Sequence, residues 1–315
     1  MKIVILDIAT LGEDIVLDPI RQLGDTIEYG TTAPEEIAVR VRDAEVVIVN
    51  KLKLNESNLS EAKNLKLICV TATGYDNIDT DYCRKRGIAL CNVPGYSTDS
   101  VAQLTLSVGL CLVNRLTSYR EYVHSGAYSE SGVANRLTPV YHELSSLTWG
   151  IVGGGAIGSR VAELASALGS RILVCRRQRE SRYEQVDLEE LCRRSDVISL
   201  HVPLSNTTRG MIGEKELSLM KPHTILINMA RGAVTDEAAV ARALEEGHLG
   251  GLGVDVYSKE PFDADHPFCR LFHRDNVCLT PHMAWGSSEA RARCVKIIAD
   301  NIAAFYEEKI FNRIV

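Results

Sequence analysis

Short apolar runs alternate with stretches of helical periodicity along almost the whole chain. In its first part, runs of strand length predict strands near Ile3–Asp7, Thr26–Tyr29, Val46–Val49, Lys66–Cys69 and Ala89–Cys91. Helical spacing predicts helices over Pro34–Arg42, Asp79–Arg86 and, as one long apolar helix, Ser97–Asn114. Strands that alternate with helices in this way are typical of βα units, which build a parallel sheet.

A second series of the same kind begins near Trp149. Its strands are predicted at Gly150–Val152, Ile172–Cys175, Val197–His201, Thr224–Asn228, Gly250–Val254 and Val277–Leu279. Its helices are predicted at Ala156–Leu168, Asp236–Glu246 and, at the end of the chain, Ser287–Tyr306. Six strands in this order indicate a doubly wound α/β sheet.

The composition excludes several classes of protein. The 315 residues suffice for two domains at roughly 150 residues each. With 45% hydrophobic and 24% charged residues, the chain is neither disordered nor fibrous. A net charge of −6 shows no basic excess, so we expect no nucleic-acid partner. The nine cysteines form no C-x-x-C pair, which argues against a zinc ribbon or a disulfide framework, and we predict no metal site.

No segment has the properties of a membrane span. The longest nearly apolar run, about Leu104 to Val113, is half the length that a span needs. The first residues, Met1–Asp7, are too short an apolar run for a signal peptide, and no small-residue cleavage site follows. We therefore expect a cytoplasmic protein that does not bind membranes.

The strongest single motif follows the strand that ends at Val152. Gly153-Gly154-Gly155-Ala156-Ile157-Gly158 has the form G-x-G-x-x-G at the junction of a predicted strand and helix. In such motifs the first glycine permits a tight turn, the second lets the backbone approach a pyrophosphate, and the third lets the helix pack on the strand. The helix N-terminus then presents free N–H groups to the phosphates. Dinucleotide binding is favoured over a glycine-rich turn without a ligand, because the flanking strands and helix are of the required type.

The end of the next strand bears on the choice of cofactor. An acidic residue is expected about 20 residues after the motif, where it bonds the ribose 2′-hydroxyl of NAD. This chain has Arg176 there, with Arg177 and Arg179 after it. A guanidinium at this place can pair with the 2′-phosphate of NADP. The alternatives are a solvated arginine cluster and an arginine that stacks on the adenine of NAD.

Several motifs together resemble one family, the D-isomer-specific 2-hydroxyacid dehydrogenases, over about Val46 to Arg291. The resemblance is carried by the glycine motif and by Ala72–Asp79, His201–Leu204, Asn228–Gly232, Gly253–Pro261 and Thr280–His282. Within the family, Asn92–Ser97 and Pro281–Trp285 are similar to glycerate dehydrogenases, also called hydroxypyruvate reductases. The resemblance implies a flavodoxin-like substrate domain of residues 1–96 and 287–315, a Rossmann domain of residues 97–286 and an active site in the cleft between them. It also implies NAD(P)H as cofactor and a homodimer built on the nucleotide domains.

Reduction of a 2-keto acid needs a cation for the carboxylate, a proton donor at the carbonyl oxygen and a hydride donor. Arg231 follows the strand that ends at Asn228, at the sheet edge where ligands bind, and its planar fork can hold a carboxylate. His282 follows another strand and suits reversible proton transfer. Glu260 can orient the imidazole. The resemblance implies the same three roles. Taken singly, an arginine is more often a surface residue and a histidine more often a packing residue, so the prediction rests on the joint placement of the three residues after strands of one sheet.

The resemblance also implies a set of binding residues. For the cofactor these are Gly153, Gly155, Ala156, Ile157, Gly158, Arg176, Arg177, Val202, Pro203, Thr208, Met229, Ala230 and Asp255. Asp255 would bond the nicotinamide carboxamide; the alternative interpretation of Asp255 and Thr208 is that they cap loops. The backbone N–H groups of Thr73 and Gly74 would hold the substrate carboxylate, and Lys51 would contact the substrate unless it is simply solvated.

The pattern predicts hydroxypyruvate, with glyoxylate as a smaller alternative, as substrate. Trp285 comes three residues after His282, so its ring is a candidate wall of the substrate pocket, or else it only packs at a domain interface. Two other readings stay open. The first is a phosphoglycerate or D-lactate type of dehydrogenase. The second is a nucleotide-sensing binding protein, which a missing His, Glu or Arg would favour.

Overall fold

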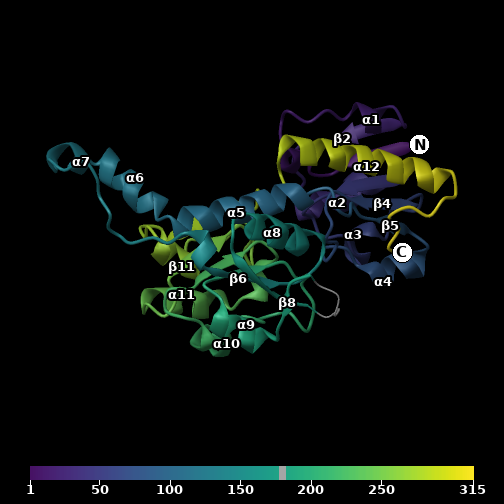
Figure 1. Ribbon diagram of the computed structural model, residues 1–315. Helices are drawn as coiled ribbons and strands as arrows, with labels where there is room; N and C mark the ends of the chain where they lie inside the picture. Colours follow the sequence, from purple (N-terminus) through teal and green to yellow (C-terminus); the bar gives the residue numbers. More distant parts are fainter. Residues whose placement is uncertain (177–181) are drawn as a thin grey trace. The chain divides into compact units, whose positions relative to one another are not determined.

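Two separate parallel sheets organise the chain (Figure 1). The computed structural model describes residues 1–176 and 182–315. They form two units, Met1–Ser97 with Trp285–Val315, and Thr98–Ala284. The predicted fold class, α/β with two parallel-sheet domains, is confirmed.

The first unit is built on a five-stranded sheet in the order β2-β1-β3-β4-β5. Its strands are β1 (Lys2–Ile5), β2 (Asp25–Glu28), β3 (Val46–Val49), β4 (Leu67–Val70) and β5 (Ala89–Cys91). All neighbouring pairs are parallel; for example, Val46 of β3 pairs with Leu67 of β4. This is the flavodoxin-like strand order.

Helices cover both faces of this sheet. They are α1 (Asp18–Arg21), α2 (Ile37–Val41), α3 (Glu56–Leu59), α4 (Thr80–Arg86) and α12 (Ser288–Tyr306), with short 3₁₀ turns η1 (Ile8–Leu11) and η2 (Pro34–Glu36). Alternate strand residues point to opposite faces. Ile3, Ile48 and Leu67 therefore pack with α1 and α12, whereas Val4, Val47 and Ile68 pack with α2, α3 and α4. The helix predicted over Pro34–Arg42 is split into η2 and α2.

The second unit contains a seven-stranded parallel sheet in the order β12-β11-β10-β9-β6-β7-β8. Its strands are β6 (Thr148–Val152), β7 (Arg171–Cys175), β8 (Glu184–Gln185), β9 (Val197–Leu200), β10 (Ile225–Asn228), β11 (Gly251–Val254) and β12 (Val277–Leu279). The strand order reverses between β6 and β9, and ligands of such sheets bind at this switch point, beyond the carboxyl ends of the strands. Sequence reasoning missed β8, whose two residues give no periodic signal.

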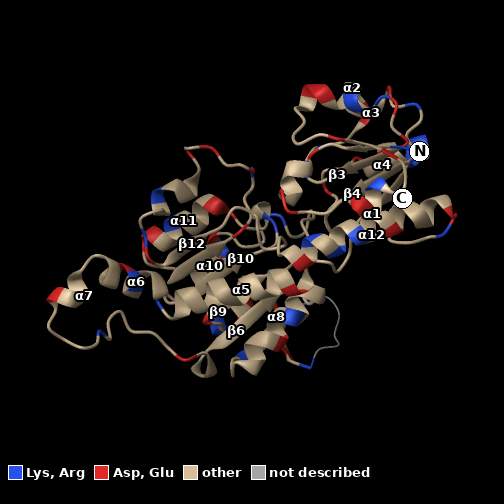
Figure 2. Ribbon diagram, turned by 90° about the horizontal axis from the view of Figure 1, so that it is seen from above, with Lys and Arg blue, Asp and Glu red and all other residues tan. Residues whose placement is uncertain are grey.

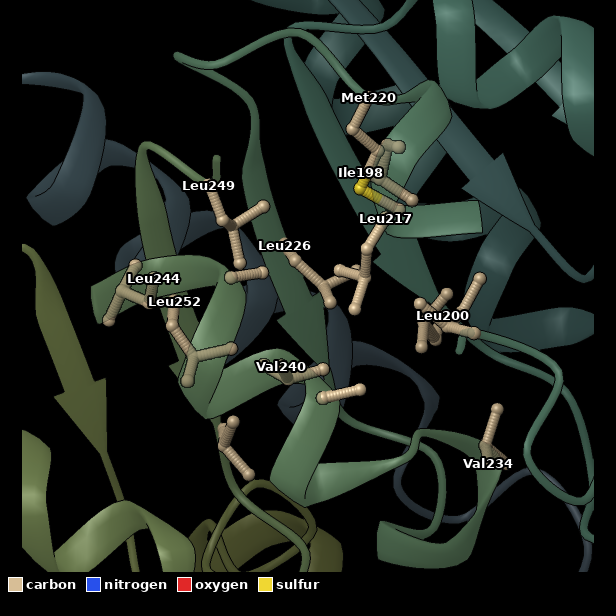
Figure 3. Close-up of a cluster of buried hydrophobic side chains, with 14 of the residues drawn as sticks. Ile198, Leu200, Leu217, Met220, Leu226, Val234, Val240, Leu244, Leu249 and Leu252 are labelled. Atoms are coloured by element: carbon tan, nitrogen blue, oxygen red, sulfur yellow. The ribbon is translucent and has the colours of Figure 1, made fainter. Parts of the chain in front are cut away.

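The helices of the second unit lie on both faces of its sheet, except for α6 and α7, which extend away from it (Figure 1). They are α5 (Thr98–Val113), α6 (Leu116–His124), α7 (Ala127–Glu130), α8 (Ala156–Ala167), α9 (Leu188–Arg194), α10 (Glu214–Leu219) and α11 (Glu237–Glu245), with η3 (Leu144–Ser146), η4 (Gly232–Val234) and η5 (Pro267–Leu271). The largest core cluster joins β9, β10 and β11 to α10 and α11 through side chains such as Ile198, Leu226 and Val240 (Figure 3). This core fixes the strand ends from which the candidate site is built.

A long excursion, residues 115–143, leaves the second unit between α5 and η3 (Figure 1). It contains α6 and α7, which sequence reasoning did not predict. Several of its apolar side chains are more than half exposed, namely Leu116, Val123, Val133, Leu137, Val140 and Tyr141. An exposed set of this kind is typical of an interaction surface.

Charges of both signs occur together on the surface helices, for example on α11 and α12 (Figure 2). No helix in the described part of the chain is long and apolar enough to cross a bilayer.

Candidate functional site

The glycine motif forms the turn between β6 and α8. Gly153 has φ +105°, and a Cβ there would meet the carbonyl oxygen of His201 at 2.6 Å. A Cβ at Gly158 would lie 1.9 Å from the carbonyl oxygen of Gly153, so the helix can approach the strand only with glycine. Gly155 differs, because its φ is −73° and a Cβ would meet nothing within 4 Å. Its exposed position at the N-terminus of α8, beside Ala156 and Ile157, leaves room for a pyrophosphate.

Arg176 follows β7 directly, as predicted from the sequence. Its stem lies against the glycine turn, since a Cβ on Gly154 would meet Arg176 Cδ at 2.7 Å. A pocket of about 400 Å³ beside the turn is lined by Gly154, Gly158 and Arg176 together with Arg182 and Tyr183. The Arg182 guanidinium carbon lies 4.8 Å from the centre of the Tyr183 ring. The pocket thus joins cations to an aromatic face. Arg177 and Arg179 lie outside the described residues.

Arg231 lies in the segment after β10, at the carboxyl edge of the sheet. The side chain of Asn228 shapes this segment by donating to the Arg231 carbonyl at 3.0 Å and accepting from the Ala230 N–H at 3.1 Å. One terminal nitrogen of Arg231 donates to the Ala230 carbonyl at 2.9 Å. The guanidinium is partly exposed, whereas Met229 and Ala230 are buried.

Glu260 and His282 are in direct contact at the same sheet edge. The distance from His282 Nδ1 to Glu260 Oε2 is 2.6 Å. The other carboxylate oxygen of Glu260 accepts the backbone N–H of Tyr257 at 2.9 Å. His282 has φ +53°, a left-handed conformation that is uncommon for residues other than glycine and that clusters at functional sites. The structure therefore brings together two of the three predicted catalytic side chains in direct contact.

Asp255 holds the loop that carries His282. The aspartate is 1% exposed. Its Oδ1 accepts from the Thr280 hydroxyl at 2.6 Å and from the Met283 N–H at 2.8 Å, and its Oδ2 accepts from the Ala284 N–H at 2.9 Å. This is the loop-capping interpretation of Asp255, and the nicotinamide contact stays a prediction.

The other predicted cofactor residues lie after β9. Thr208 is 4% exposed, and its hydroxyl donates to the Pro203 carbonyl at 2.6 Å and accepts from the Ser205 N–H at 2.8 Å. Thr208 thereby caps the loop that begins with Val202 and Pro203. Both of these residues remain accessible at the carboxyl edge of the sheet.

Four predicted substrate-binding residues belong to the first unit. Lys51 follows β3, and its backbone N–H donates to the buried carboxylate of Asp7 at 2.8 Å. The Thr73 hydroxyl donates to the Val93 carbonyl at 2.9 Å. Within residues 1–176 and 182–315, the backbone N–H groups of Thr73 and Gly74 have no acceptor in hydrogen-bonding distance.

Trp285, the fourth of these residues of the first unit, packs against the Tyr96 ring, with 6.1 Å between the ring centres. This contact is expected if the indole packs within the first unit. The substrate role of Trp285 stays a prediction.

Sequence reasoning missed a second glutamate–histidine pair, Glu237 and His266, which is buried in the same unit. No spacing rule links these residues, which lie 29 positions apart. In the described part of the chain, no group of three or more His, Cys, Asp or Glu side chains could hold a metal ion.

Residues 106–284 match the family model described as D-isomer specific 2-hydroxyacid dehydrogenase, NAD binding domain. The chain belongs to this family. The match covers the glycine turn, Arg231, Glu260 and His282. It confirms the family that the sequence motifs resemble, and with it an oxidoreductase whose cofactor is a nicotinamide dinucleotide.

Two relatives and one solved structure illustrate the likeness. The chain is 41% identical to a glyoxylate reductase of Thermococcus litoralis, over 86% of this chain and 83% of that protein. It is 35% identical to a glycerate dehydrogenase of Methylorubrum extorquens, over 99% of this chain and 98% of that protein. The crystal structure of an Aquifex aeolicus D-lactate dehydrogenase with NAD and lactic acid superposes with a TM-score of 0.87 at 32% identity, covering 98% of this chain and 96% of that one.

Proposed function

We propose that this dehydrogenase reduces a small 2-keto acid to the D-2-hydroxy acid, with His282 as the proton donor. The observation that carries the proposal is the 2.6 Å contact between His282 and Glu260 at the end of β12, in the unit that matches the NAD-binding domain. An imidazole held by a carboxylate suits reversible proton transfer.

Arg231, Glu260 and His282 have separate roles in the proposed reaction. The glycine turn and the N-terminus of α8 would hold a nicotinamide dinucleotide, which when bound would supply a hydride for C2 of the keto acid. The imidazolium of His282 donates its proton to the carbonyl oxygen, so that a C–H bond and an O–H bond replace the C=O π bond. Glu260 orients the ring and stabilises its charged form. The guanidinium of Arg231 binds the substrate carboxylate with two parallel bonds.

Hydroxypyruvate and glyoxylate are the substrates that we favour. The support is the sequence pattern at Asn92–Ser97 and Pro281–Trp285, together with the glyoxylate reductase and glycerate dehydrogenase among the relatives. Thr73 and Gly74 would offer backbone N–H groups to the carboxylate. Trp285 would limit the size of the group attached to C2, and Lys51 would contact that group.

The test is a comparison of kcat/KM for hydroxypyruvate, glyoxylate, pyruvate, 3-phosphohydroxypyruvate and phenylpyruvate. The proposal expects hydroxypyruvate to lead, followed by glyoxylate. A lead for phenylpyruvate would require a large apolar pocket. A lead for the phosphorylated acid would indicate an anion site, and Lys51 is then the first residue to replace. Turnover of none of the five would contradict the proposed function.

For the cofactor we favour NADP(H) over NAD(H). The support is the position of Arg176 where NAD-binding chains carry an acid, and the pocket that Arg176 shares with Arg182 and Tyr183. Two guanidinium groups and an aromatic ring suit a phosphorylated adenosine.

We also favour a homodimer in the cytoplasm. The exposed apolar side chains of residues 115–143 suit burial against a second copy of the chain. All nine cysteines are free thiols, as expected of a reducing compartment. Light scattering during size-exclusion chromatography tests the dimer, and a monomer at micromolar concentration would contradict it. Val123→Asp should convert a dimer to monomers, because it places a charge in the interface.

A further inference from the structure

The second glutamate–histidine pair lies beside the loop that carries Glu260. Glu237, the first residue of α11, and His266, just before η5, are each 9% exposed. Glu237 Oε2 and His266 Nε2 are 3.2 Å apart. The other ring nitrogen, Nδ1, accepts the backbone N–H of Phe268 at 3.2 Å. A neutral ring with Nδ1 as acceptor carries its proton on Nε2, so His266 donates to Glu237.

Glu237 also holds Ser258. The Ser258 backbone N–H donates to Glu237 Oε1 at 2.9 Å, and the Ser258 hydroxyl donates to Oε2. The neighbouring Tyr257 donates its backbone N–H to Glu260, whose second oxygen contacts His282. A continuous chain of contacts thus runs from the buried carboxylate of Glu237 through residues 257–260 to the candidate proton donor.

The same arrangement reaches Arg231. Gly232, the next residue, lies so close to the loop that a Cβ there would be 2.0 Å from the backbone carbon of Tyr257. Glu237 begins the helix that follows this segment. Its bonds to Ser258 therefore fasten the segment after β10 to the loop after β11, and these two stretches carry Arg231 and Glu260.

The charged groups on the surrounding elements pair elsewhere. Arg242 of α11 bonds Glu214 at 2.6 Å, and Arg270 of η5 lies 3.6 Å from Glu245. Lys259 in the loop bonds Asp263. Tyr257 lies near both glutamates. Burial is the main cause that raises the pKa of Tyr257, and the negative charges of Asp255, Glu260 and Glu237 raise it further.

We propose that Glu237, fixed by His266, is a positioning residue for the proton-transfer pair. Glu237 touches no reacting group. It holds residues 257–260 so that Glu260 reaches both the Tyr257 N–H and His282. The inference rests on the proposed function, and it implies that loss of Glu237 acts through Glu260. Because substrate binding by Arg231 is affected less directly, kcat should fall more than KM rises.

The experiment compares Glu237→Gln with Val240→Ala. Val240 is 1% exposed on the same helix, so its truncation destabilises the unit while removing none of the hydrogen bonds of Glu237, Ser258 or Glu260. We expect Glu237→Gln to lower kcat about tenfold, the order of one lost charge-assisted hydrogen bond. The pH at which kcat/KM falls to half on the alkaline side should also decrease. Val240→Ala should change neither, at an equal or larger loss in Tm. Ser258→Ala, which removes only one of the bonds, should give a smaller change in the direction of Glu237→Gln.

Two further measurements separate the possible failures. In a Glu260→Gln background, Glu237→Gln should change kcat less than twofold, because the route through Glu260 is already lost. Histidine-selective NMR, with the His282 signal assigned by His282→Asn, should show a shifted titration midpoint in Glu237→Gln without any turnover assay. An unchanged His282 titration and pH profile in both Glu237→Gln and Ser258→Ala would overturn the inference. A wild-type enzyme that reduces no 2-keto acid would instead overturn the proposed function.

Discussion

Two pairs in the second unit consist of a glutamate and a histidine in contact, yet their surroundings differ. Glu260 and His282 join the loops after β11 and β12, whereas Glu237 and His266 join α11 to the residue before η5. In the Glu260–His282 pair the side chains are 27% and 22% exposed, whereas in the Glu237–His266 pair both are below 10% exposed. His266 uses both ring nitrogens on the protein. His282 stands at the carboxyl edge of the sheet with positive φ. Exposure and position on the sheet, more than residue identity, separate the histidine that we propose as proton donor from the one that we propose fastens a loop.

A third contact between an acid and a histidine, Asp196 with His223, differs from both pairs in the exposure of its side chains. Here the acid is 13% exposed and the imidazole is 64% exposed. Asp196 also accepts from the Thr148 N–H at 2.8 Å and from Lys221 Nζ at 2.7 Å. Asp196 thus stabilises the fold, and the exposed ring of His223 contributes little to this stability.

The largest expected effect separates the first two histidines. His282→Asn should lower kcat by about 10²–10⁴-fold, because a positioned acid is lost, while dinucleotide binding stays nearly intact. His266→Asn should lower kcat by about tenfold and also lower Tm, because a buried hydrogen-bonding partner is lost. Steady-state kinetics, calorimetry and dinucleotide titration check both variants. Equal losses of kcat in the two variants, both folded, would contradict the different roles assigned to His282 and His266.

Arg231→Lys tests substrate binding separately from proton transfer. An ammonium group cannot form the two parallel bonds of a guanidinium, so kcat/KM should fall by about 10–150-fold. The alkaline limb of the pH profile should stay in place, since Glu260 and His282 are untouched. A displaced limb would show that Arg231 is part of the proton-transfer unit.

Nucleotide preference should be independent of both glutamate–histidine pairs. We expect kcat/KM to favour NADPH over NADH by about 10–150-fold, the value of a charge-assisted bond to the 2′-phosphate. Arg176→Asp should reverse the preference, and Glu237→Gln should retain it. Equal or better performance with NADH in the wild type would contradict the NADP assignment.

The smallest effects concern Asp196. Burial opposes ionisation of this acid, but the bonds from Lys221, the Thr148 N–H and His223 hold its pKa below the ordinary value of 3.8. An acid with a depressed folded pKa contributes stability above its unfolded pKa, and that contribution is lost as the pH falls through the folded pKa. Asp196→Asn should thus cost about 1–3 kcal/mol of unfolding free energy near neutral pH and less below pH 4.

His223→Ala should cost less than about 0.5 kcal/mol at neutral pH, because the ring is exposed. Urea unfolding at several pH values measures both variants. A cost for Asp196→Asn that does not vary with pH would show that the acid serves packing rather than charge.

Much of the fold could be predicted, because long βα units give a clear periodicity. Strands such as Val46–Val49 were located to the residue, and α5 within one residue at each end. The two-residue strand β8 was missed, since it is held by neighbours rather than by its own pattern, including an ion pair between Arg171 and Glu184. Helices α6 and α7 were missed because they bury no apolar face within this chain.

The candidate site divides in the same way. Arg231, Glu260 and His282 could be predicted as candidates because each follows a strand and stands in a recognisable motif, and the structure brings Glu260 and His282 into contact. Glu237 and His266 could not, because their role depends on a contact between distant segments. Asp255 shows a further limit, since its sequence position suggests a ligand and its geometry shows bonds to its own loop.

The most direct test of the central claim is the fate of the transferred hydrogen. Hydroxypyruvate would be reduced with reduced dinucleotide that carries deuterium at both C4 positions of the nicotinamide, and the product would be analysed by mass spectrometry after chiral separation. We expect D-glycerate with deuterium at C2, and at least a hundredfold less of it from His282→Asn at the same enzyme concentration. A product without deuterium at C2, or the L-isomer, would contradict the central claim.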